Sequence, residues 1–98
     1  MKIEKKYLPT PVDCRHIAIP EDLADLVELL ARNIHDIWAM KRMQDGWQWG
    51  PERRDMEKMH PCLVEYHELP EDEKSYDRDM ATETIRVIMA LGFRLEKC

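Results

Sequence analysis

The chain has 98 residues, of which 44% are hydrophobic and 36% are charged. A chain of this size forms a single domain, residues 1–98, with one core that needs neither disulfides nor metals. Its net charge of −5 excludes general binding to a nucleic acid polymer, which depends on neutralising phosphates. No apolar run approaches the ~20 residues that cross a bilayer, and the N-terminus lacks a signal-peptide core. We therefore expect a cytoplasmic protein that does not engage membranes.

The first nineteen residues are predicted to be extended, because Pro9 and Pro11 are incompatible with a helix. Pro20 and the acidic residues after it suit the first turn of a helix, which is predicted to continue to Gln44 and to stop at Gly46. Apolar residues recur at helical spacing along this segment: Leu23, Leu26, Val27, Leu30, Ile34, Ile37 and Trp38.

Residues 47–69 are predicted to form an irregular connector. Its GWQWGP stretch fits a very short strand or a turn, and residues 62–66 fit a short strand or a buried extended segment. Pro70 and three acidic residues after it indicate the start of a second helix, and Gly92 indicates its end. The apolar stripe of this second helix is predicted to consist of Tyr76, Met80, Thr84, Val87, Ile88 and Leu91. The predicted fold is mainly α with short β pieces. Two long helices pack together, an extended segment precedes them, and the aromatic-rich connector covers one end of the pair.

The cysteines and histidines do not predict a metal centre or a catalytic site. Cys14, Cys62 and Cys98 are odd in number and contain no CxxC pair, which argues against a disulfide framework. Their spacing from the histidines matches no structural zinc pattern. No nucleophile–base pair and no paired carboxylates are evident. We expect no cofactor, no bound metal and no enzymatic activity.

The strongest functional candidates lie at the end of the first helix. At 100° per residue, His35, Trp38 and Arg42 fall within about 60° of one another at the edge of the apolar stripe. They offer a hydrogen-bonding group, a flat apolar surface and a fixed positive fork. Trp47 and Trp49 arrive beside them because Gly46 turns the chain. These five residues are the predicted ligand-binding set, although a purely packed corner would use the same residues.

The same stretch carries motifs of a known family. They are N-x-H-x-x-W at residues 33–38, G-W-x-[WY]-G at 46–50, H-P-x-L-V at 60–64, L-P at 69–70 and the closing ALGF at 90–93. In this order and spacing, the chain from Tyr7 to Phe93 resembles the ryanodine-receptor repeat, the RyR domain. With one copy and no channel segment, it resembles a small, free-standing, prokaryote-type member.

The resemblance implies a helical, non-catalytic domain of a kind that occurs as tandem pairs in large cytosolic receptors. It also implies that the tryptophan matching Trp38 faces a cleft that accepts a nucleotide-like molecule. We therefore expect a binding module for a purine-nucleotide-like small molecule, a peptide or a protein partner. The alternative is a structural domain that acts through homo- or hetero-oligomerisation. Ile85 and Met89 lie off the predicted stripe, where either a second copy in a homodimer or the N-terminal segment would cover them.

Overall fold

The computed structural model describes residues 5–98 and confirms a mainly α fold. Helix α1 spans Ala24–Gln44 and helix α2 spans Glu71–Ala90. Two 3₁₀ turns and two very short strands complete the described elements: η1 Glu21–Leu23, β1 Gln48–Trp49, β2 Met59–His60 and η2 Tyr66–Glu68. No helix in the described range is long and apolar enough to cross a membrane.

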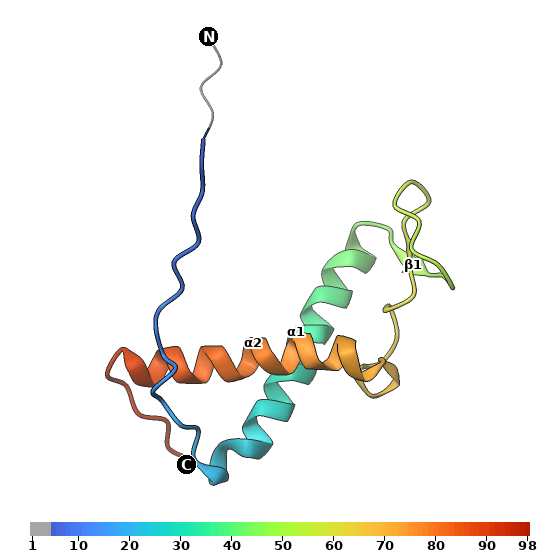
Figure 1. The fold of residues 1–98 in the computed structure, drawn as a ribbon. Helices are drawn as coiled ribbons and strands as arrows, with labels where there is room; N and C mark the ends of the chain where they lie inside the picture. Colours follow the sequence, from blue (N-terminus) through green and yellow to red (C-terminus); the bar gives the residue numbers. More distant parts are fainter. Residues whose placement is uncertain (1–4) are drawn as a thin grey trace.

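The two long helices cross each other, and the connector between them projects beyond one end of the pair (Figure 1). Of the N-terminal segment predicted to be extended, residues 5–19 are described: they form no helix or strand and contain a turn at residues 15–16, and the blue part of the segment runs away from the helices (Figure 1). Residues 1–4 of that prediction lie outside the described residues. Cys14 anchors the base of this segment, because its buried thiol donates a hydrogen bond to the Glu83 carboxylate on α2 (3.2 Å). The C-terminal residues fold back beside the beginning of α1, where Leu95 and Leu26 line the same hollow.

Helix α1 ends as its glycine predicts, and the way it ends positions the connector. Gly46 has φ of +90°, a conformation that residues with a side chain rarely adopt. Its N–H donates to the Met43 carbonyl, and the Trp47 N–H donates to the Arg42 carbonyl. These two bonds form a Schellman motif. The chain therefore reverses at once, and Trp47 returns to the side of α1 that carries Arg42.

The strands of the connector hold this turn against the loop that follows. β1 pairs in parallel with β2, with Gln48 opposite Met59 and Trp49 opposite His60. Gly50 is required beside this pair, because a Cβ there would lie 2.8 Å from the Cβ of Met59. No strand forms at residues 62–66, which continue instead into the turn η2.

The core is small and lies where the connector meets both helices. Ala31, Tyr66 and Leu69 form its buried cluster, and Cys62 and Val64 pack against it. On α2 the fully enclosed residues are Ala81 and Ile85. Short side chains at buried helix positions allow two helices to approach closely.

The predicted apolar stripe of α2 is mostly wrong, because only Val87 and Ile88 among its residues are half-buried. Ile85, which was expected on an uncovered flank, is only 1% exposed, whereas Tyr76, Met80 and Leu91 are each more than 60% exposed. The first helix follows its prediction better, although Ile37 is exposed and His35, expected at the stripe edge, is buried.

Two basic residues explain the error on α2. Lys74 and Arg78 precede Ala81 and Ile85 on the same face of the helix, so the core-facing side reads as polar in the sequence. Long basic side chains can lay an aliphatic stem along a core and keep the charge outside. The guanidinium of Arg78 holds the Glu28 carboxylate of α1 through two contacts of 2.9 and 3.2 Å.

We predict that Ile85→Ala lowers the free energy of unfolding by about 2–5 kcal/mol, as expected for a large-to-small change in a core. Leu29→Ala is the matched control, because it truncates a helical aliphatic residue that is 64% exposed, and it should cost no more than about 0.5 kcal/mol. Urea unfolding curves measure both variants. Equal losses would contradict the placement of Ile85 in the core.

Candidate functional site

A cavity of about 250 Å³ opens between the C-terminal half of α1, the connector and the start of α2. Its walls come from all three parts of the chain: His35, Trp38, Arg42, Arg53, His60, Cys62, Leu69, Glu73, Tyr76 and Asp77. The volume is slightly below the ~300–1,000 Å³ of typical ligand pockets. It suits one planar ring system whose remaining atoms stay at the rim.

His35 forms the floor of this cavity and connects α1 to the connector. The residue is 4% exposed, and its Nε2 lies 2.7 Å from the carbonyl oxygen of Val64. Because a carbonyl oxygen only accepts hydrogen bonds, Nε2 carries the proton that is donated. The imidazole also stacks on the Trp38 ring, with centroids 5.7 Å apart. His35 therefore fixes the orientation of Trp38 as well as the position of the loop.

Arg42 lies against two indole rings and has no carboxylate partner among residues 5–98. Its guanidinium carbon is 4.7 Å from the Trp47 ring centroid and 5.8 Å from that of Trp38. Cation–π contacts of this kind hold a guanidinium in place without neutralising its charge. Arg42 therefore presents a positioned positive charge at the cavity, and it is near enough to Asp55 to contribute to the lowered pKa of that carboxyl without forming an ion pair with it.

His60 completes the aromatic wall on the connector side. Its ring meets Trp38 edge to face, with centroids 5.0 Å apart. Its Nδ1 accepts the backbone N–H of Cys62 at 3.0 Å, so in the neutral ring Nε2 is the donor. Burial, reinforced by Arg53 and Arg42, holds the pKa of His60 below its ordinary value. At neutral pH His60 is an uncharged hydrogen-bond donor.

The wall on α2 is acidic. Glu73 and Asp77 are one turn apart and half-buried, and neither forms an ion pair with another residue in the described part of the chain. Burial raises the pKa of Asp77, and the nearby Glu73 raises it further while His35 opposes the change. Tyr76, which is 69% exposed, forms the outer rim beside them.

The structure brings together three of the five predicted site residues. His35, Trp38 and Arg42 line the cavity, and Trp47 supports it from behind Arg42. Trp49 lies outside the lining and is 56% exposed on β1. The predicted ligand-binding set did not include His60 or the acidic residues Glu73 and Asp77. The H-P-x-L-V motif was the available signal for His60. Nothing in the spacing of Glu73 and Asp77 distinguishes them from other acidic residues at a helix start.

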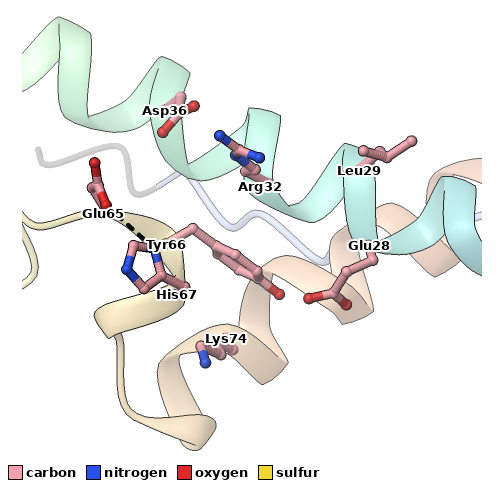
Figure 2. Close-up of a pocket in the computed structure, with 8 residues that line it drawn as sticks. All are labelled: Glu28, Leu29, Arg32, Asp36, Glu65, Tyr66, His67 and Lys74. Atoms are coloured by element: carbon pink, nitrogen blue, oxygen red, sulfur yellow. Dashed lines mark ion pairs between the residues drawn. The ribbon is translucent and has the colours of Figure 1, made fainter.

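A second, larger hollow of about 460 Å³ lies on the other side of η2, between α1 and the beginning of α2 (Figure 2). Its charges are largely paired internally, because Glu28 binds Arg78 and Lys74 binds Glu71. The Tyr66 ring is buried, and burial together with the Glu28 carboxylate raises the pKa of its hydroxyl. The Tyr66 hydroxyl forms no hydrogen bond within the described chain. Because its tyrosine ring is buried and its exposed imidazole, His67, already contacts Glu65 and Glu68, this hollow is the weaker candidate.

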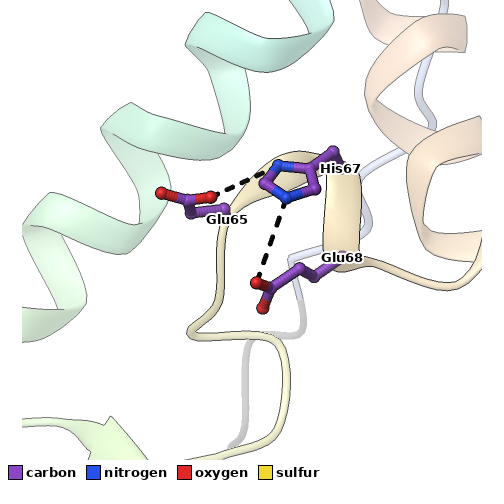
Figure 3. Close-up of side chains that lie close together, drawn as sticks. All are labelled: Glu65, His67 and Glu68. Carbon is purple, nitrogen blue, oxygen red and sulfur yellow. Dashed lines mark ion pairs between the residues drawn. The ribbon is translucent and has the colours of Figure 1, made fainter.

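Three side chains on η2 lie close enough to suggest a metal site, but their geometry is that of ion pairs (Figure 3). Glu65 approaches Nδ1 of His67 at 3.3 Å, and Glu68 approaches Nε2 of the same ring at 3.9 Å. One ligand atom from each residue lies within 4.8 Å of the other two, but the carboxylates contact different nitrogens of the His67 ring as ion pairs. All three residues are exposed.

The lowered pKa of His60 predicts a pH dependence of stability. In the unfolded chain His60 takes up a proton near its ordinary pKa of 6.5, whereas in the folded protein its pKa is lower and the ring is protonated only at a lower pH. Stability from this residue is therefore complete above about pH 6.5 and declines as the pH falls below it. His60→Asn keeps an acceptor for the Cys62 N–H and does not titrate. Urea unfolding at pH 7.5 and pH 5 should show the wild type losing more stability than the variant, and equal losses would contradict the assignment.

A comparison with known protein families gives one match that covers nearly the whole chain. A family model described as the RyR domain matches residues 7–97. The matched range contains both long helices, the connector and every residue that lines the cavity. Three of the sequence motifs form parts of the cavity and its surroundings. Residues 33–38 supply its floor, residues 46–50 the turn after α1, and residues 60–64 the connector wall. The chain belongs to the RyR domain family.

Proposed function

We propose that this RyR domain is a non-enzymatic cytoplasmic binding module and that the cavity beside Trp38 takes a planar, anionic small molecule of the purine-nucleotide type. The observation that carries the proposal is Arg42, held against two indole rings at the cavity without a carboxylate partner among the described residues. A positioned guanidinium of this kind suits a phosphate or carboxylate. A peptide with an aromatic and an acidic side chain would use the same groups.

The half-exposed Trp38 supports the ring-binding part of the proposal. His35 and His60 hold the indole from two directions, so its orientation is set before a ligand arrives. Stacking of one base on such a ring contributes about 1–3 kcal/mol. With one ring and one charge contact, we expect a dissociation constant between about 1 mM and tens of micromolar.

The cavity chemistry does not favour an enzyme. Cys62 is the only thiol that lines it, and burial raises the pKa of Cys62, which opposes formation of the reactive thiolate. The single bond that positions His60 comes from the backbone N–H of Cys62, not from its thiol. These features favour a packing and hydrogen-bonding role for Cys62 and His60 over a role in nucleophilic catalysis.

NMR titration with purine 5′-monophosphates tests the proposal. The indole signal of Trp38 should shift, and Arg42→Gln should weaken binding by about tenfold, since hydrogen bonds to charged groups contribute about 1.5–3 kcal/mol. Arg32→Gln is the matched control, because Arg32 is also an α1 arginine without an ion-pair partner in residues 5–98, and it lines the other hollow. Shifts absent from Trp38, or equal losses in both variants, would refute the proposal.

Oligomerisation is the second candidate function, and the exposed stripe of α2 favours it. Tyr76, Met80 and Leu91 recur at helical spacing and remain exposed in the single chain. An apolar helix face of this kind is typical of a surface that packs against a second copy or another protein.

Light scattering on a concentration series tests self-association. If a homodimer uses this face, the mass should rise toward twice 11.7 kDa, and Met80→Asp should return it to that of the monomer because the charge would be buried without a partner. Met56→Asp, on an exposed connector loop, is the control and should not change the mass. A monomer mass at every concentration would exclude the homodimer.

A further inference from the structure

The ligand cavity keeps opposite charges apart on facing walls. Arg42 reaches it from α1, whereas Glu73 and Asp77 reach it from α2, and no ion pair joins the two walls in the described structure. Elsewhere the chain does pair such groups across the helices, as Arg78 and Glu28 show. A cavity with a cationic end and an acidic end is complementary to a ligand that is anionic at one end and donates hydrogen bonds at the other.

The acidic wall restricts which atoms can face it. An ionised carboxylate accepts hydrogen bonds and donates none. Glu73 and Asp77 are half-buried on this wall, and neither forms an ion pair within the described chain. Ligand atoms that accept hydrogen bonds would therefore meet repulsion at this wall. Atoms that donate them would be stabilised.

Building on the proposed function, we infer that the cavity selects a planar ring with two adjacent hydrogen-bond donors on its inner edge, and hence guanine over adenine nucleotides. The ring lies beside Trp38, its donor edge faces Glu73 and Asp77, and its phosphate reaches Arg42 at the rim. The cavity volume of about 250 Å³ suits this division, with the base inside and the phosphate outside.

Guanine, hypoxanthine and adenine differ in the hydrogen-bonding groups on the base edge that would contact Glu73 and Asp77. Guanine presents N1–H and the exocyclic amino group side by side, so one carboxylate can accept both. Hypoxanthine presents N1–H without the neighbouring amino group. Adenine presents one amino group next to N1, which is an acceptor and would face a carboxylate oxygen. Bidentate recognition of a base edge typically contributes about 1–3 kcal/mol of discrimination.

Calorimetric titration with GMP, IMP and AMP at one ionic strength tests the inference. All three carry the same phosphate, so the Arg42 contact is common to them. GMP should bind about tenfold more tightly than AMP, within the range expected for one bidentate contact, and IMP should lie between them. Asp77→Asn should reduce the ratio of GMP to AMP affinity toward one, because an amide also donates hydrogen bonds. Glu73→Gln tests the same wall if the first variant does not fold.

Asp79→Asn is the matched control, because Asp79 is an exposed α2 carboxylate outside the cavity lining, and the change in net charge is the same. It should leave the GMP to AMP ratio unchanged. Binding at Trp38 with AMP equal to or tighter than GMP would overturn the guanine inference and leave the proposed function standing. An equal change of the ratio in Asp79→Asn would also overturn it. If none of the nucleotides binds, both fail.

Discussion

The hydrogen bond from His35 to the Val64 carbonyl controls how the connector sits on helix α1. His35 is 4% exposed, and leaving its ring nitrogen unpaired in such a place would cost about 1–3 kcal/mol. The bond therefore holds the loop at one position along the helix. That position places His60 against Trp38 and brings the beginning of α2 across the cavity. The N-x-H-x-x-W motif is thus first a structural device, and the cavity follows from it.

The distribution of charge differs between the contact that joins the two helices and the cavity beside Trp38. Arg78 and Glu28 join the two helices through a bidentate contact, and Arg78 lowers the pKa of Glu28. At the cavity the opposite happens, because Arg42 and the two acidic residues stay unpaired. Charged side chains without ion-pair partners do not add to the stability of the fold. Local departures of this kind from the rules of stable folding are expected at functional sites.

The sequence was sufficient for the helices, their ends and the corner around Trp38. Those features depend on local rules, such as the glycine that ends α1 and the acidic residues after Pro70. It was insufficient for the buried face of α2, because Lys74 and Arg78 lie on the same face as Ala81 and Ile85 and give that face a polar pattern. The sequence also could not predict that Glu73 and Asp77 form a wall of the cavity. Which helical carboxylates face Arg42 depends on how the two helices cross, and a one-dimensional pattern does not contain that angle.

A crystal structure of the protein with bound GMP would test the proposed site most directly, because it locates the base, the phosphate and the side chains together. We expect the ring beside Trp38, its amino edge within hydrogen-bonding distance of Asp77 or Glu73, and the phosphate next to Arg42. The proposal would be contradicted if the nucleotide occupied the hollow between Arg32 and Lys74, or if the Trp38 cavity stayed closed and empty at saturating nucleotide.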